Sequence, residues 1–426
     1  MKKLKWLSLT VSLVLLLSVV LSSCAGTTTV TSTSSTTLTS TTTQVSTTTQ
    51  PTTITTTQVS TTTQPTTITT TSTTTNTTTV PTTLTTTKTT TTTSTTAIPM
   101  ANSLTGAGGT FPQPLYAKWF DVYNTQFGVQ INYQGVGSGA GITQITAGTV
   151  DFGASDGIMT DTQVAAATAA FGPILHIPTT DGAVAVIYNI PGVTGQLNLT
   201  GDVLANIYLK VIKTWNDPAI TALNPGVNLP NTAIAVVHRS DSSGTSNIFT
   251  NYLDKVSTQW HTQLGYGNSV AWPPGDIGGE KNAGVAAQVQ QIPGAIGYVE
   301  LAYALQNNLL YAKLKNASGN YVSPTLASTA AAASGITLPD DMKIMITNSA
   351  NANAYPIVGF TWILAYQNQA NQAKGEAVVK MLWWAIHDGQ QYCAALNYAT
   401  LSADAVTKAE NEILSIQYKG QPLLTR

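Results

Sequence analysis

Three segments of this chain share one pattern, in which a short strand-like run enters a turn rich in glycine and serine that opens a helix. The expected strands lie at 102–105, 129–133 and 234–237. After the first turn, apolar residues such as Leu115 and Trp119 recur at helical spacing. Further short apolar strands are expected at 184–188, 295–299 and 361–365. Strands that alternate with helices predict α/β lobes with mostly parallel sheets.

The helix starts that follow these turns are suited to binding an anion. A helix start leaves backbone N–H groups without intrahelical partners, and the helix dipole adds partial positive charge there. Three such starts can converge on one anion, with hydroxyl donors at Thr110, Ser138, Ser243 and Thr245. A single Gly-rich turn is usually only a connector, so the hypothesis depends on the recurrence.

The charged residues in these turns suggest which anion. Arg239 is the only arginine after residue 100 apart from Arg426, and its guanidinium offers a bidentate fork to a tetrahedral oxyanion. A surface arginine is an equal alternative. Asp241 is placed to pair with Arg239, although it also suits an N-cap. Asp156 follows an expected strand, where it is either a turn residue or a site acid. A carboxylate beside an anion repels it unless the ligand carries a proton, which phosphate does near neutral pH and sulfate does not.

The N-terminus predicts export. Three lysines lead into an apolar run at 6–21 that is short for a membrane-spanning helix. We therefore expect a signal peptide at 1–23. The end of this segment, Leu-Ser-Ser-Cys, resembles a bacterial lipobox, which makes Cys24 the expected lipidation site; an ordinary cleavage site with a chance cysteine is the alternative.

Residues 27–96 consist almost entirely of threonine with serine, glutamine and proline, and 44–57 recurs approximately as 58–71. Such a sequence buries too little apolar surface to fold, so we predict a disordered stalk over 24–100. Threonine-rich stalks are often O-glycosylated, and a naked tether is an equal alternative.

The part that can fold, 101–426, is long enough for two domains. It carries 14 basic and 19 acidic residues, a net charge of −5. This charge balance does not predict the basic surface that nucleic-acid binding requires. The one cysteine besides Cys24 is Cys393, which we expect to be a small buried hydrophobe.

Several motifs in order resemble the phosphate-binding component of the bacterial phosphate ABC transporter. They are LTGAGGTFPQPLYAKW at 104–119, YQGVGSG at 133–139, VDFGASD at 150–156, RSDSSGTS at 239–246 and PGAIGYVE at 293–300. The resemblance implies an α/β, two-lobed periplasmic-binding-protein fold of type II, with mixed sheets flanked by helices and hinge crossover strands. Lobe I would comprise 101–180 plus 356–426, and lobe II 181–355.

The resemblance also implies the function: capture of inorganic phosphate outside the cytoplasm and delivery to the membrane permease of an ABC transporter. The protein would be a monomer, held by its lipid at the outer face of the cytoplasmic membrane or at the cell surface. No cofactor, metal or nucleic acid is expected.

Carried over position by position, the expected phosphate-binding residues are Thr110, Phe111, Ser138, Asp156, Arg239, Ser243, Gly244 and Thr245, with Asp241 in support. Phe111 would offer its backbone N–H, and Asp156 would accept the phosphate proton. Arg239 would supply the charged fork, braced by Asp241. Three positions depart from the family pattern: Gly109 replaces a frequent alanine, and Ala140 and Ser242 stand where glycine is common.

Three other functions remain open. A phosphatase-like enzyme would need metal ligands or a nucleophile, but the histidines at 176, 238, 261 and 387 are scattered and none has the spacing of metal ligands. A surface adhesion or sensing module is compatible with the stalk. A binder of another tetrahedral oxyanion, such as sulfate or molybdate, is opposed mainly by Asp156 together with Arg239.

Overall fold

The computed structural model describes residues 36–37, 67–79, 85–97 and 100–425. The chain forms two compact units, residues 1–98 and 99–426. The expected signal peptide at 1–23 and the expected lipidation site Cys24 lie outside the described residues.

The first unit contains a ribbon of three strands, β1 (Thr36–Thr37), β2 (Thr67–Thr79) and β3 (Thr85–Ala97), with β3 in the middle. All pairs are antiparallel. Over these residues the structure differs from the disordered stalk that the composition predicts. Threonine is β-branched and favours extended backbone, and a ladder of backbone hydrogen bonds does not itself require an apolar core.

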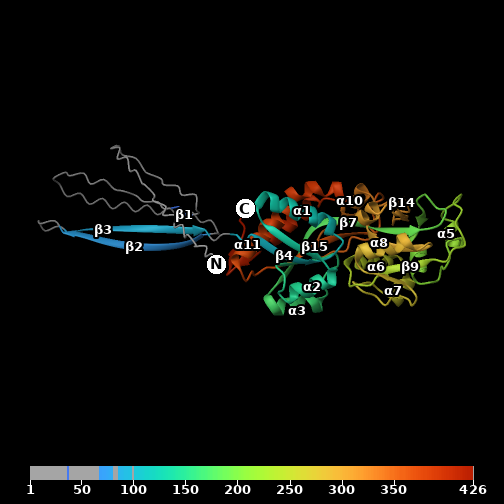
Figure 1. Ribbon diagram of the computed structural model, residues 1–426, viewed down its shortest axis with the longest axis horizontal. Coiled ribbons are helices and arrows are strands. Elements are labelled where there is room, and N and C mark those ends of the chain that lie inside the picture. The colour runs from blue at the N-terminus through green and yellow to red at the C-terminus, as the bar shows by residue number, and fades with distance from the viewer. Residues whose placement is uncertain (1–35, 38–66, 80–84, 98–99, 426) are drawn as a thin grey trace, which may run out of the picture. The chain divides into compact units, whose positions relative to one another are not determined.

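The second unit is built on a nine-stranded sheet (Figure 1), in which the strand order is β10-β9-β11-β7-β15-β6-β4-β5 and β12 also pairs with β7. The strands are β4 (Ser103–Gly108), β5 (Gln130–Gly135), β6 (Phe152–Ser155), β7 (Ile174–Asn189), β9 (Ala235–Arg239), β10 (Ile277–Gly279), β11 (Ala295–Glu300), β12 (Leu310–Tyr311) and β15 (Val358–Tyr366). Two small sheets comprise β8 (Asn198–Leu199), β13 (Lys313–Lys315) and β14 (Tyr321–Val322), and β16 (Gln417–Tyr418) with β17 (Gln421–Pro422).

The sheet has two parallel wings joined by antiparallel strands. One wing is β5-β4-β6 and the other is β10-β9-β11. Between them, β7 pairs with β15 along its first part and with β11 along its last part, antiparallel in both cases. The prediction of mostly parallel sheets is therefore wrong at the centre, because one strand runs from wing to wing and another returns. The β7–β15 ladder shifts register between Thr361 and Trp362.

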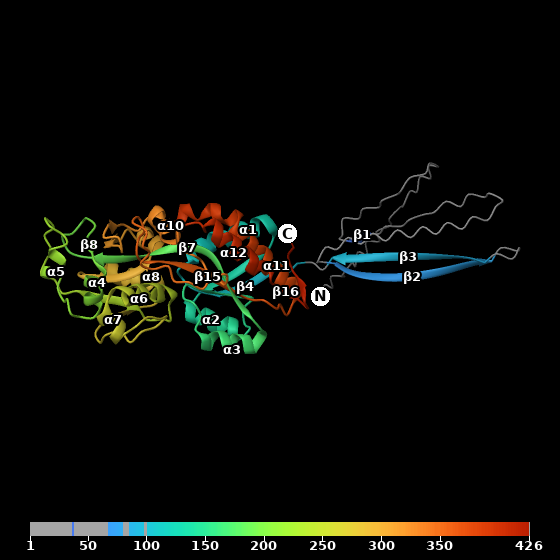
Figure 2. The same cartoon turned by 180° about the vertical axis from the view of Figure 1, so that it is seen from behind.

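Helices cover both wings (Figures 1 and 2): α1, α2, α3, α11 and α12 lie around β4, and α4 to α8 lie at the other end. The helices are α1 (Gln113–Phe127), α2 (Ser138–Thr146), α3 (Asp161–Phe171), α4 (Gly201–Tyr208), α5 (Pro218–Thr221), α6 (Gly244–Val256), α7 (Thr258–Gln263), α8 (Lys281–Gln291), α9 (Leu301–Gln306), α10 (Leu326–Ala333), α11 (Gln372–Ile386) and α12 (Ala403–Leu414), with 3-10 turns η1 (Asp388–Tyr392) and η2 (Ala394–Leu396). This is the two-lobed α/β arrangement expected from the sequence.

Local sequence explains the strand–turn–helix units, and all three predicted ones are confirmed. In α1, Pro112 occupies the N-cap and Gly128 ends the helix in the left-handed region at φ 69°. The helix buries Leu115, Trp119 and Tyr123 against the sheet, as their spacing predicts.

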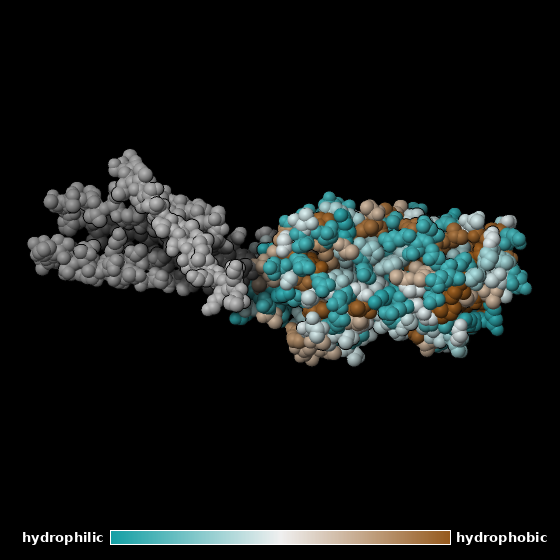
Figure 3. All heavy atoms as spheres, in the orientation of Figure 1, coloured by the Kyte–Doolittle hydropathy of each residue, from teal (hydrophilic) through white to brown (hydrophobic). Residues whose placement is uncertain are grey.

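The core runs along the crossing strands. All nine residues of β15 are buried, which explains its nearly continuous apolar sequence. Cys393 is buried and free, and burial raises the pKa of its thiol to about 12, so the prediction of a small buried residue is confirmed. On the face shown in Figure 3, hydrophobic residues of this unit are scattered among hydrophilic ones. Among the described helices, none is long and apolar enough to cross a membrane.

Candidate anion-binding site

The predicted site residues converge at the inner ends of the two wings. Ser138, the first residue of α2, shows this most directly, because its Oγ accepts hydrogen bonds from the N–H of Asp156 (3.2 Å) and the N–H of Gly244 (3.1 Å). Ser138, Ser243 and Thr245 are fully buried. One hydroxyl therefore joins the end of β6, the start of α2 and the start of α6.

Asp156 follows β6 directly and is 1% exposed. Its Oδ1 accepts a hydrogen bond from Thr361 Oγ1 at 2.8 Å, and its Oδ2 accepts one from Ser138 Oγ at 3.3 Å. Burial raises the pKa of this carboxyl to about 7, against the opposing effects of the Thr361 and Ser138 hydrogen bonds and the Arg239 charge. Near neutral pH the group can therefore hold or release a proton within the site.

Arg239 ends β9, and its side chain is almost wholly buried. Its Nε and Nη2 donate to Asp241 Oδ1 and Oδ2 at 2.7 and 2.5 Å, and its Nη1 donates to Thr245 Oγ1 at 3.3 Å. The predicted bracing of Arg239 by Asp241 is confirmed. Of the five N–H donors of this guanidinium, one on Nη1 and one on Nη2 have no partner among the described residues, and both remain available to an oxyanion.

Two glycines allow the close approach of these loops. A Cβ on Gly244 would lie 2.5 Å from Ser138 Oγ and 2.6 Å from Asp156 Oδ2. A Cβ on Gly137, whose φ is +90°, would lie 2.5 Å from Asp241 Oδ2. Gly137 belongs to the loop before α2 and Asp241 to the turn before α6, so glycine is needed where the two wings meet.

The loop after β4 is held by tyrosine hydroxyls. Tyr303 Oη donates to the carbonyl of Thr110 at 2.7 Å, and Tyr398 Oη donates to the carbonyl of Phe111 at 2.6 Å. The Phe111 ring is buried in the core. Within the described residues the Phe111 N–H has no acceptor, which leaves it available to a ligand.

Three polar residues that the sequence analysis missed also lie in this site. Thr361 reaches Asp156 from β15, and Asn282, near the start of α8, donates from Nδ2 to Thr110 Oγ1 at 3.0 Å and to Thr245 Oγ1 at 3.2 Å. Glu300, at the end of β11, is fully buried, and burial raises its pKa well above the usual value. A signal for Asn282 existed: β10, which ends in two glycines, and α8 form a fourth strand–turn–helix unit. Thr361 is the one hydroxyl-bearing residue between Val358 and Ala365 in an apolar run.

Histidines do not form a metal site. His238 is half-buried, with Nδ1 at 2.8 Å from its neighbour's carbonyl and its ring stacked on Trp272 at 4.8 Å. His176 belongs to β7, where its Nε2 accepts a hydrogen bond from the N–H of Met159, and burial lowers its pKa to about 3. No group of His, Cys, Asp or Glu in the described part of the chain is arranged to hold a metal ion.

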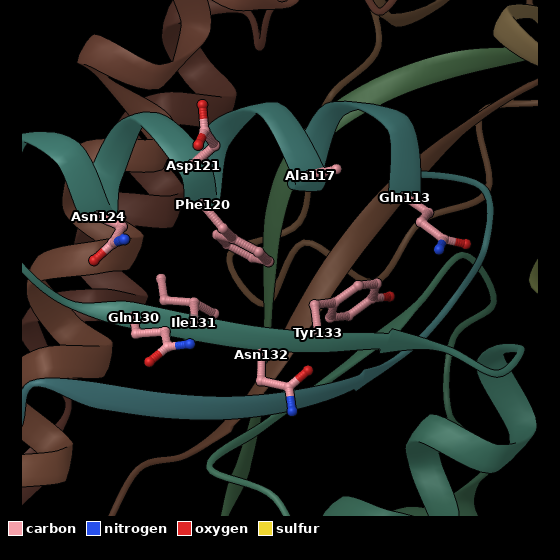
Figure 4. A pocket seen from close by; sticks show the side chains of 9 residues that line it. All are labelled: Gln113, Ala117, Phe120, Asp121, Asn124, Gln130, Ile131, Asn132 and Tyr133. Atoms are coloured by element: carbon pink, nitrogen blue, oxygen red, sulfur yellow. The ribbon is translucent and has the colours of Figure 1, made fainter.

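A separate hollow of about 300 Å³ lies between α1 and β5 (Figure 4). Side chains of Gln113 and Asp121 from α1 and of Asn132 and Tyr133 from β5 line it. It contains none of the predicted anion-binding residues. Two of its lining residues contact the loop after β4: the N–H of Gln113 donates to the carbonyl of Thr110 at 3.3 Å, and Tyr133 Oη donates to the carbonyl of Gly109 at 2.7 Å.

Comparisons with known proteins identify the family of this chain. A family model described as a PBP superfamily domain matches residues 22–380. A phosphate-binding protein PstS of Pasteurella multocida is 44% identical over 313 residues, covering 73% of this chain and 89% of that protein. A protein of the same name from Methanocaldococcus jannaschii is 37% identical over 305 residues, covering 67% and 78%. A solved periplasmic phosphate-binding protein, bound with phosphate, has the same fold with a TM-score of 0.60 at 21% identity, covering 76% of this chain and all of that one. The chain therefore belongs to the PBP superfamily, within the family of the PstS phosphate-binding proteins.

Proposed function

We propose that this protein captures inorganic phosphate outside the cytoplasm and delivers it to the permease of an ABC transporter. The observation that carries the proposal is one buried carboxyl, Asp156, set among hydroxyl donors near a braced arginine. The relatives named as phosphate-binding proteins support it.

The site chemistry favours a protonated oxyanion. The free edge of Arg239, the Phe111 N–H and the buried hydroxyls offer donors to the unprotonated oxygens. Asp156 offers the acceptor for a P–O–H group. Fully ionised sulfate has no proton to donate, so it would face a carboxylate without a hydrogen bond, which is the arrangement that a buried site rejects most strongly.

The same proposal covers how the protein is held and how it moves. Cys24 carries the lipid anchor, residues 24–100 act as the spacer, and the protein works as a monomer. Lobe I comprises 101–180 with 356–426, lobe II comprises 181–355, and the crossing strands β7 and β15 form the hinge between them. Binding occurs without hydrolysis.

The test is calorimetric titration of the full chain with phosphate, arsenate and sulfate at neutral pH, together with incubation with a chromogenic phosphate ester. We expect tight binding of phosphate, much weaker binding of sulfate, and no coloured product. Release of coloured product would favour the phosphatase-like alternative, and equal binding of sulfate would overturn the assignment of the ligand.

A further inference from the structure

Asn282 lies at the start of α8 and is completely buried beside the anion-binding site. Its Oδ1 accepts a hydrogen bond from the N–H of Glu300 at 3.1 Å. Its Nδ2 donates to two hydroxyl oxygens, Thr110 Oγ1 at 3.0 Å and Thr245 Oγ1 at 3.2 Å. One amide therefore connects the loop after β4, the start of α6 and the end of β11.

The amide can adopt only one orientation. The oxygen and nitrogen of an asparagine have nearly the same shape, so the hydrogen-bond partners decide which is which. Here one end faces the N–H of Glu300, and a backbone N–H can only donate. That end must be the oxygen, so the NH₂ group must face the hydroxyls of Thr110 and Thr245.

This orientation fixes the role of both hydroxyls. A threonine hydroxyl has one hydrogen and two lone pairs, and in open surroundings it can donate or accept. Thr110 Oγ1 accepts from Asn282 Nδ2 and also from the Asn282 backbone N–H at 3.4 Å. Thr245 Oγ1 accepts from Asn282 Nδ2 and from Arg239 Nη1. With their lone pairs engaged, both hydroxyls are left to donate, and within the described residues neither has a protein acceptor for its hydrogen.

We propose that Asn282 is a positioning and specificity-determining residue that makes the hydroxyls of Thr110 and Thr245 obligatory donors to the bound anion. This proposal rests on the proposed function, and it explains why one carboxyl suffices to select the ligand. If either hydroxyl could turn and accept, a second protonated oxygen would fit the site. With both fixed as donors, Asp156 is the acceptor available for a ligand proton.

The decisive variant is Asn282→Asp, which keeps the shape and inverts the polarity. An ionised carboxylate at this position accepts hydrogen bonds from Thr110 and Thr245, which turns their hydrogens away from the anion, and it adds a negative charge. A protonated carboxyl can donate again. Loss of phosphate affinity in this variant should therefore be large at pH 8 and smaller at pH 5. Other ionisable groups near position 282 also change with pH. Their effect is removed by dividing each variant's affinity by that of the wild type at the same pH. These groups are Asp156, Arg239, Asp241, Lys281, Glu300 and Tyr303.

Two further variants complete the test. Asn282→Ala removes the donors without adding charge, so we expect about tenfold weaker phosphate binding, with the same ratio to wild type at both pH values. Asn251→Asp is the matched control, because Asn251 is a buried asparagine of α6 whose Oδ1 accepts from Thr347 Oγ1, a role that aspartate retains. We expect it to bind phosphate within about threefold of wild type at both pH values.

Phosphate affinity is measured by calorimetry on the full chain, and thermal unfolding confirms that each variant is folded. At pH 8 we expect Asn282→Asp to bind phosphate at least about a hundredfold more weakly than the wild type. At pH 5 this difference in affinity should be at least about tenfold smaller. Wild-type affinity in Asn282→Ala, or the same loss for Asn282→Asp at both pH values, would overturn the proposal. If Asn282→Asp does not fold, Asn282→Ala alone decides. Failure of the wild type itself to bind phosphate would instead refute the proposed function.

Discussion

Replacing Asp156 with asparagine should remove the pH dependence of the choice between phosphate and sulfate. Hydrogen phosphate brings its own proton to the Asp156 carboxylate, so its complex needs no other proton. Sulfate brings none, so its complex requires Asp156 itself to be protonated. Since the pKa of Asp156 is raised to about 7, the cost of that protonation grows by about 1.4 kcal/mol for each pH unit above 7.

The wild-type ratio of phosphate to sulfate affinity should therefore rise about tenfold per unit between pH 7 and pH 9, or about a hundredfold in total. In Asp156→Asn the amide is neutral at every pH, so the ratio should be lower at pH 9 and flat. The assay is competitive calorimetry with both ions at three pH values. Asp161→Asn, at an exposed residue of α3, is the control and should keep the wild-type slope. A flat wild-type ratio, or a slope retained in Asp156→Asn, would refute this role of the carboxyl.

The same variant should change how stability depends on pH. The folded protein holds the Asp156 proton up to about pH 7, whereas the unfolded chain releases it near 3.8, so folding takes up a proton between these values and stability falls as pH rises through that window. The loss amounts to about 4 kcal/mol by pH 8. Denaturant unfolding without phosphate at pH 4 and pH 8 should show this contribution in the wild type and its absence in Asp156→Asn. Equal pH dependence in both proteins would contradict the raised pKa.

Three further predictions follow from the site and core. Arg239→Lys should weaken phosphate binding at least about a hundredfold in calorimetry, because an ammonium cannot pair with both oxygens of Asp241 and still offer a two-pronged edge to the ligand; wild-type affinity would remove the fork from the mechanism. Gly137→Ala should weaken binding far more than Gly192→Ala, since both have positive φ but only the first Cβ would meet a neighbour; equal effects would mean that backbone strain alone matters. Cys393 should resist alkylation at pH 8 in the folded protein and react after denaturation, as followed by mass spectrometry; rapid labelling of the native protein would contradict its burial.

The sequence predicts the parts of the site that are local in the chain. Arg239 and Asp241 are two residues apart in one turn, so their pairing follows from the turn itself. Asp156 is predicted because it directly follows a strand. The missed contacts are long-range: Thr361 is 205 residues from Asp156, and Asn282 is 172 residues from Thr110. No local sequence pattern predicts such contacts, because these residues come together only through the paths of the crossing strands.

The same limit applies to the sheet. Apolar runs predict that β7, β11 and β15 exist. An apolar run does not indicate whether its strand pairs parallel or antiparallel with its neighbours. The order and direction of these strands depend on how the chain passes between the wings, which a strand's own residues do not specify.

The register shift in the β7–β15 ladder falls beside Thr361, whose hydroxyl donates to Asp156. An interrupted ladder bends and twists more than a regular one. In the hinge that we propose, a change in the angle between the wings would move Thr361, which donates to the site carboxyl. Opening at that hinge would then also change the proton affinity of Asp156, so a mutation that stiffens this bend should shift the pH at which phosphate is released.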